Sequence, residues 1–175
     1  MQRLFFALWP SDALRAQMAA EVAPIVARGE GRAIPPQNLH ITLAFLGVVA
    51  SEKVAAAMAV AAEIESPPLR LSIERVEVWR DAGILCMTPA IAPELAELVD
   101  RLRIKLLARQ LEPDQKEFRP HVTLARDWRE RHVDGSIGPF EWRADEFVLV
   151  ESAATRDGSA YRIVGRWPLT CEKRA

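Results

Sequence analysis

Two matched tetrapeptides hold the residues of this 175-residue chain that are best suited to chemistry. His40-Ile41-Thr42-Leu43 recurs as His121-Val122-Thr123-Leu124, 81 positions further along. In both copies polar residues alternate with β-branched or apolar ones, which is the pattern of a strand. Residues i and i+2 of a strand share a face. Each copy therefore predicts an imidazole with a hydroxyl beside it on one face.

A pair of histidines suits acid–base chemistry around a phosphate. An imidazole titrates near neutrality, so one ring can act as base while the other acts as acid. A histidine on a half-buried strand is more often a structural residue than a catalyst. The strand preference of threonine explains Thr42 and Thr123, but it does not explain the repeated placement of His40 and His121. The repetition therefore favours catalysis, with an activity that is bell-shaped in pH around the ordinary imidazole pKa of about 6.5.

Two arginines near the second motif are candidates for binding phosphate. Arg126 follows the motif directly, but strand alternation places Ala125 on the His121 face and Arg126 on the opposite face. Arg126 reaches the cleft only if the strand ends or twists there. Arg119 shares the His121 face and could equally lie at the surface.

Other mechanisms leave no trace in the sequence. It contains no Gly-x-Ser-x-Gly, no glycine-rich phosphate loop and no Cys-x-x-Cys. A metal site needs three or four ligands, and neither histidine motif has an adjacent cysteine or carboxylate. We expect no metal and no cofactor. The remaining histidine, His132, is interpreted as a solvated loop residue, and Trp79 and Trp167 as core residues.

Composition describes an ordinary globular protein. The net charge of −1 gives no bulk attraction to nucleic acid or to an anionic membrane. Cys86 and Cys171 are too few for a disulfide framework, which favours a reducing compartment. The apolar run 4–9 is too short for a signal-peptide core, and no apolar stretch approaches the length of a membrane span. We expect a cytoplasmic monomer with no membrane partner.

Periodicity and turn signals predict the order of the elements. Helices are expected from Ser11 to about Ile25, where Pro24 should kink or shorten the helix, and over 51–65 and 93–111. Loop or turn signals lie at 29–37, 81–83, 134–135 and 157–158. Strands are expected over 3–9, 40–47, 69–79 with a bulge, 84–88, the segment of His121, 140–142, 147–151 and 161–167.

This order contains a weak twofold repeat, because each histidine strand is preceded by a helix and followed by further strands. No long linker separates the two halves. The pattern predicts an α+β fold in which residues 1–175 form one bilobal unit. Two antiparallel sheets flank a central cleft, and the helices lie outside.

The motifs resemble those of the two-histidine (2H) phosphoesterase superfamily, which is marked by a repeated His-x-Thr/Ser-x motif. Within it the chain closely resembles the bacterial and archaeal RNA 2′,3′-cyclic phosphodiesterases, also named 2′-5′ RNA ligases. The resemblance runs in order through nearly the whole chain, over residues 3–8, 35–47, 118–126, 158–161 and 167–169. One departure is Ala44, where relatives often carry Lys or Arg, and this implies weaker contacts to a longer RNA.

The resemblance implies a pseudo-twofold bilobal fold and metal-independent opening of a 2′,3′-cyclic phosphate to a 2′-phosphomonoester. The substrate would be RNA or an oligonucleotide with such an end, and the reverse joining of RNA through a 2′–5′ bond is a further activity of such proteins. His121 would activate water and His40 would protonate the leaving oxygen, although the opposite assignment stays open. Thr42, Thr123 and Arg126 would bind the phosphate. The alternative is a non-catalytic binding module for phosphorylated RNA ends.

Overall fold

The computed structural model describes residues 1–90, 92–130, 132–133, 136–156 and 158–170. These residues contain three α-helices, namely α1 (Asp12–Arg28), α2 (Ser51–Ala62) and α3 (Pro93–Ala108). The described strands are β1 (Gln2–Leu8), β2 (Arg32–Ala33), β3 (Ile41–Val49), β4 (Leu69–Trp79), β5 (Ile84–Pro89), β6 (Val122–Arg126), β7 (Ser136–Ala144), β8 (Glu146–Thr155) and β9 (Gly158–Pro168).

The strands form one antiparallel sheet with a twofold pattern. Its order is β7-β4-β5-β6-β3-β1-β8-β9, and β2 adds to β6. The two motif strands, β3 and β6, are therefore central, with three further strands beyond each. They are paired only at Ile41 and Val122, so the sheet consists of two halves that meet at one residue pair. The predicted α+β fold with two antiparallel halves is confirmed, and the structure adds that the halves are continuous.

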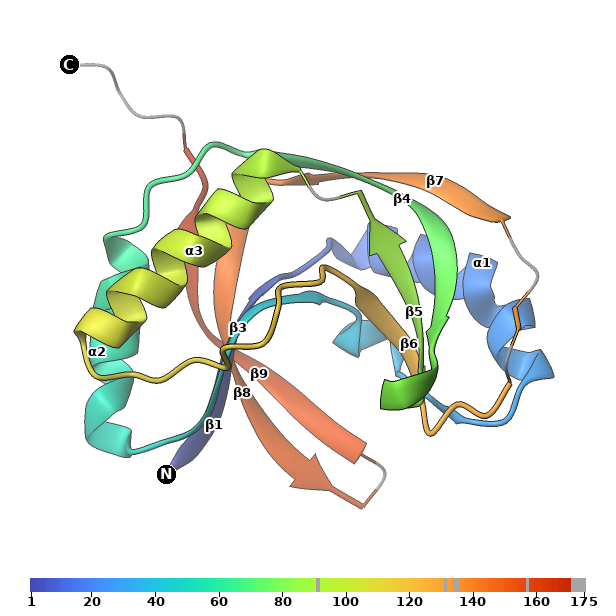
Figure 1. Cartoon of the computed structure of the whole chain (residues 1–175), viewed down its shortest axis with the longest axis horizontal. Coiled ribbons are helices and arrows are strands. Elements are labelled where there is room, and N and C mark those ends of the chain that lie inside the picture. The colour runs from blue at the N-terminus through green and yellow to red at the C-terminus, as the bar shows by residue number, and fades with distance from the viewer. Residues whose placement is uncertain (91, 131, 134–135, 157, 171–175) are drawn as a thin grey trace.

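Each half is covered by helices that lie outside the sheet. Figure 1 shows α2 and α3 together on one side of the molecule and α1 on the opposite side. Helix α1 follows β1 but packs against β6 and β7 of the other half. Helix α3 follows β5 but packs against β3 and against α2, again in the other half. Each half of the sheet is thus held by a helix from the other half of the chain.

The helices are positioned by their apolar stripes. The side chains of α3 that recur at helical spacing have no exposed area: Leu95, Leu98, Val99, Leu102 and Leu106. Burying an aliphatic side chain of this size stabilises the fold by roughly 1.5–3 kcal/mol. The same core continues under both halves of the sheet.

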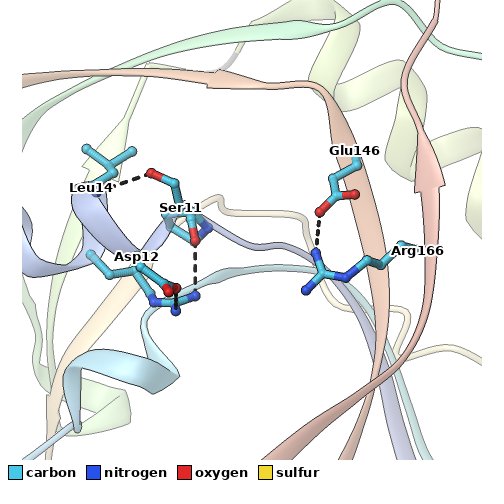
Figure 2. A network of polar contacts seen from close by, with 7 residues as sticks. Ser11, Asp12, Leu14, Glu146 and Arg166 are labelled. Carbon is cyan, nitrogen blue, oxygen red and sulfur yellow. Dashed lines mark hydrogen bonds and ion pairs between the residues drawn. The ribbon is translucent and has the colours of Figure 1, made fainter.

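Helix α1 begins where the sequence predicts. The Ser11 hydroxyl accepts a hydrogen bond from the backbone N–H of Leu14 at 3.2 Å, and Asp12 pairs with Arg15 in the first turn (Figure 2). Arg15 also donates to the carbonyl of Pro10 at 3.0 Å. Figure 2 shows Glu146 and Arg166 paired nearby, on the neighbouring strands β8 and β9. These contacts fix the chain at the end of β1.

The structure corrects several expected boundaries. Helix α1 runs through Pro24 to Arg28, because the exposed position of Pro24 leaves the carbonyl of the preceding turn open to water. Strand β3 continues past Gly47, which adopts φ +65° where Leu46 has no partner in β1. The predicted loop over 29–37 contains β2, because its backbone pairs with β6. Helices α2 and α3 end three residues earlier than expected, and β7, β8 and β9 are longer.

His40 and His121, expected inside strands, directly precede β3 and β6, and the bounds of β1 and β5 differ from the expected ones by one residue. The remaining expectations hold or lie outside the described residues. The predicted bulge in β4 is present between Ile73 and Arg75, and Gly83 closes the β4–β5 turn with φ +59°. The predicted turn at 134–135, Asp157 of the next one and Cys171 lie outside the described residues. Within the described part of the chain, no helix is long and apolar enough to cross a membrane.

Candidate active site

The single pair between the motif strands brings both motifs to one place. Because β3 and β6 are antiparallel and Ile41 pairs with Val122, the register places His40 across from Thr123 and Thr42 across from His121. Beyond this pair the two strands diverge. The edge of β6 then pairs with β2, and the carbonyl of Phe45 in β3 accepts from the N–H of Asp114 at 2.8 Å.

A small cavity lies between the diverging strands. Its volume is about 50 Å³, and all five residues predicted for the site line it. It is lined by His40, Thr42, His121, Thr123, Arg126, Ile34, Asn38 and Tyr161. The sequence therefore identified five of the eight lining residues. Of the other three, Asn38 and Tyr161 lie in segments that carry the family resemblance but were given no role, and Ile34 lies outside those segments.

Both imidazoles are held in the same way. Nδ1 of His40 lies 2.6 Å from the carbonyl oxygen of Asn38, and Nδ1 of His121 lies 2.8 Å from that of Arg119. A carbonyl oxygen only accepts, so each Nδ1 carries the proton and donates it. Nε2 of each ring is then the nitrogen available for proton transfer. In His40 this nitrogen accepts from the Thr42 hydroxyl at 3.2 Å.

Arg126 reaches the cavity because β6 contains a bulge. Leu85 pairs with Ala125 and Cys86 pairs with Thr123, so Leu124 has no partner in β5. One extra residue reverses the alternation after Thr123 and turns Arg126 toward the histidine face. The simple alternation that placed Arg126 on the opposite face is therefore wrong. Its positive charge lowers the pKa of both histidines.

The environment of both histidines favours the neutral imidazole, because it lowers the pKa of each ring. Burial lowers the pKa of His40 from 6.5 to about 4, against the opposing effect of the Asn38 carbonyl. Burial is also the main cause of the lowered pKa of His121, and the nearby guanidinium groups of Arg126 and Arg119 act in the same direction. A bound phosphate anion would oppose these effects, because it favours the imidazolium form of each ring.

Each histidine lies against a tryptophan that in turn contacts an arginine. The Trp9 ring is stacked on His40 at 5.1 Å between centroids, and Arg15 lies 5.8 Å from the Trp9 ring. In the other half the corresponding centroid distance from Trp79 to His121 is 4.5 Å, and the guanidinium carbon of Arg119 is 3.9 Å from the Trp79 ring. The two tryptophans thus restrict where the imidazoles can move.

The two histidines differ in how closely they are packed. His40 lies among aromatic rings, with Phe5 at 4.9 Å and Tyr161 at 5.4 Å between ring centroids. His121 instead borders an open groove of about 380 Å³ that reaches Trp79 and Arg119.

Trp79 and Trp167 are both predicted to be core residues, and the structure bears this out only for Trp167. Trp79 is half-buried beside His121, so its assignment to the core is wrong. Trp167 packs against Phe6 and Phe147 as predicted. His132 is exposed, as expected for a solvated residue. Trp9 and Trp79 carried no sequence signal for the site, since tryptophans more often fill cores.

Comparison with known proteins identifies the family of this chain. Residues 10–156 match the family described as the 2′-5′ RNA ligase superfamily. The chain is 32% identical to the RNA 2′,3′-cyclic phosphodiesterase of Escherichia coli strain K12, over 97% of both chains. It is 30% identical to the protein of the same name from Archaeoglobus fulgidus, over 91% of this chain and 96% of the relative.

Solved structures show the same fold. The crystal structure of E. coli LigT complexed with 3′-AMP matches with a TM-score of 0.88 and 31% identity, over 97% of this chain and 98% of that one. TT0787 of Thermus thermophilus matches with a TM-score of 0.81 and 26% identity, over 97% of this chain and 99% of that one. The sequence resemblance is confirmed: this chain belongs to the 2′-5′ RNA ligase superfamily.

Proposed function

We propose that this protein hydrolyses RNA or nucleotide ends that carry a 2′,3′-cyclic phosphate and releases a 2′-phosphomonoester. The observation that carries the proposal is the matched tautomer of the two histidines. Both donate from Nδ1 to a backbone carbonyl, which leaves both Nε2 atoms for proton transfer at one cavity. The relatives named RNA 2′,3′-cyclic phosphodiesterase support the same reaction.

In the proposed reaction water attacks phosphorus while Nε2 of His121 accepts its proton. The bond from phosphorus to the 3′ oxygen breaks, and protonated His40 donates to that oxygen. General acid–base groups of this kind contribute typically about 10²–10⁴-fold each. Thr42, Thr123 and Arg126 bind the non-bridging oxygens as negative charge develops there.

The shapes of the two sides support this division of roles. Attacking water and leaving oxygen lie on opposite sides of phosphorus in an in-line displacement. The groove beside His121 gives water an open approach. The partly exposed rings of Trp9 and Tyr161 beside His40 suit the ribose and base that carry the leaving oxygen.

Protonation of His40 is coupled to substrate binding in this scheme. Its pKa of about 4 leaves the free imidazole neutral near pH 7. The cyclic phosphodiester carries a negative charge, which raises the pKa of both rings when it enters the cavity. One proton taken up with the substrate produces the acid–base pair. Ligation, in which a 5′-hydroxyl replaces water as the nucleophile and a 2′–5′ bond forms, needs the same two groups.

The test is conversion of a 2′,3′-cyclic mononucleotide in the presence of EDTA, with the phosphate position of the product determined. We expect a 2′-phosphate and a rate unchanged by the chelator. A 3′-phosphate product would contradict the roles given to the two oxygens. Activity lost with EDTA and restored by a metal ion would contradict metal-independent catalysis. Binding without product would instead identify a binding module.

A further inference from the structure

A second cavity lies beyond His121, on the β4–β5 side of the molecule. It has a volume of about 310 Å³, and its lining includes Ser72, Arg75, Glu77, Trp79, Thr88 and Arg119. Trp79 and Arg119 also line the open groove, and that groove reaches His121 and Thr42 of the phosphate cavity. The groove therefore lies between the second cavity and the phosphate cavity, and it shares two lining residues with each.

Arg119 forms a flat platform on this path. Its guanidinium carbon lies 3.9 Å from the centre of the Trp79 ring, and its side chain is exposed. Trp79 in turn lies 4.5 Å from His121. Nucleobases stack on arginine planes and aromatic rings of this kind. A base on Arg119 would lie beside the groove that His121 also lines.

The Glu77 carboxylate offers hydrogen-bond acceptors that can distinguish one base from another. Its Oε2 accepts from the Trp79 indole N–H at 2.9 Å, and its Oε1 accepts from the Thr88 hydroxyl at 3.0 Å. These bonds fix the carboxylate in the cavity wall, and each oxygen keeps a further acceptor site. Guanine presents two adjacent donors, N1–H and the 2-amino group, that match a carboxylate.

The other half of the molecule does not repeat this arrangement. In one half, Ala7 of β1 pairs with Thr42 of β3 on one side and with Val148 of β8 on the other. In the other half, Cys86 of β5 pairs in the same way with Thr123 of β6 and with Glu77 of β4. Val148 is thus the counterpart of Glu77, and it is buried in an apolar cluster with Phe5. The carboxylate belongs to the His121 side alone.

We propose that this second cavity is the subsite for the RNA strand that supplies the 5′-hydroxyl in 2′–5′ ligation, and that it prefers guanosine at that 5′ end. The inference rests on the proposed function, because it places the attacking oxygen beside His121. The 5′-hydroxyl attacks phosphorus and gives its proton to Nε2 of His121. The bond to the 3′ oxygen breaks, and His40 protonates it. One phosphoester bond forms and one breaks, so no further reactant is needed.

The experiment measures two products in one reaction. The protein is incubated with 2′,3′-cyclic AMP and a dinucleoside monophosphate that has a free 5′-hydroxyl, either GpA, IpA or ApA. The ratio of 2′–5′-linked product to 2′-AMP is determined. This ratio cancels effects on the shared chemistry, so an altered His121 position does not change it. We expect the ratio to be about tenfold higher with GpA than with ApA. IpA, which lacks the 2-amino group, should fall between them.

Glu77→Gln should lower the GpA ratio about tenfold and leave the ApA ratio unchanged. The matched control is Glu151→Gln, which removes a carboxylate that pairs with Arg162 in the other half and should change neither ratio. Equal ratios for GpA and ApA, or an unchanged GpA ratio in Glu77→Gln, would overturn the inference. So would 2′-AMP formation with no 2′–5′ product. Failure of the proposed function is distinct, since no 2′-AMP would then form even without an acceptor.

Discussion

The two catalytic candidates are chemically alike but have different surroundings. A backbone carbonyl two residues earlier in the chain orients each imidazole, at Asn38 for His40 and at Arg119 for His121. His40 is packed by Phe5, Trp9 and Tyr161, whereas His121 faces an open groove. Equal residue types at matched positions can therefore take the two opposite roles that a displacement at phosphorus needs.

Replacing either histidine by alanine should nearly abolish turnover. We expect His40→Ala and His121→Ala each to lower the rate of cyclic-phosphate hydrolysis by about 10²–10⁴-fold, because each removes one proton-transfer group. Initial rates with a 2′,3′-cyclic mononucleotide measure the effect. The control is His132→Ala, which removes the third histidine at an exposed position and should keep full activity. Near wild-type hydrolysis by either folded variant would refute the assignment.

The pH optimum of kcat/KM should lie below the ordinary imidazole pKa of about 6.5, around which the sequence predicts the activity to be centred. Catalysis needs one neutral and one protonated imidazole, and burial lowers the pKa of both rings, that of His40 to about 4. The bell in kcat/KM, which reports the free protein, should therefore be centred below pH 6.5. The bell in kcat should lie at higher pH, because bound phosphate favours imidazolium.

Threonine variants provide the control for this profile. Thr42→Val and Thr123→Val should lower the rate, by about 10² if each removes one donor to the developing charge, and keep both limbs of the bell. A kcat/KM profile centred at higher pH than kcat would contradict the electrostatic argument. Loss of one limb in a threonine variant would contradict the role of the hydroxyls.

At the scale of elements, matched bulges decide which side chains enter the site. Leu43 has no partner in β1 and Leu124 has none in β5, so the alternation changes at the same point of both motif strands. The residues two positions later, Phe45 and Arg126, are counterparts of different chemistry. Phe45 contacts Arg3, with the guanidinium carbon 5.0 Å from its ring, while Arg126 faces the histidines.

The sequence predicted the elements and the four motif residues because those signals are local. Period-two alternation identified β3 and β6, and helical spacing identified α3. The position of Arg126 depends on a bulge that is specified by pairing with β5, and this pairing is not local. Trp9 directly follows β1, which pairs with β3, and Trp79 ends β4, which β5 separates from β6, so both reach the histidines only through the strand order of the sheet. These contacts could not be read from spacing along the chain.

Helix α1 offers a test of an element that forms against local preference. Pro24 lies inside this helix at an exposed position and has no N–H to donate to the carbonyl of Ala20. Pro24→Ala should raise the free energy of unfolding by about 1–3 kcal/mol, since proline costs up to about 3 kcal/mol in a helix interior. Urea denaturation measures the gain, and hydrolysis should not change.

The matched control for this prediction is Pro93→Ala. Pro93 occupies the first turn of α3, where proline is tolerated because the N–H would have no partner in the helix. This variant should show no gain in stability, or a small loss from the more flexible unfolded chain. A destabilised Pro24→Ala, or equal gains in both variants, would contradict the argument.

At the scale of the whole molecule, the twofold pattern explains how one site arises between two halves. Sheet order, helix placement and bulges are matched, and helices α1 and α3 each pack on the half that does not contain their preceding strand. The halves therefore hold each other, although their motif strands meet only at Ile41 and Val122. The cavity forms where this pairing stops.

This junction should couple stability to catalysis in a way that other core positions do not. Ile41 and Leu98 are both fully buried, but Ile41 lies between His40 and Thr42 at the junction, and Leu98 lies on α3 outside the sheet. Ile41→Ala and Leu98→Ala should each lower the free energy of unfolding by about 2–5 kcal/mol.

Only Ile41→Ala should also lower kcat, by more than about tenfold, because a displacement on the order of 1 Å between catalytic groups costs about 10² in rate. Urea denaturation gives the stabilities, and initial rates are compared at a temperature where both variants are folded. Equal kcat values for the two variants would mean that the junction only stabilises the fold. A loss confined to Ile41→Ala would mean that the one residue pair sets the distance across which the two histidines act on phosphate.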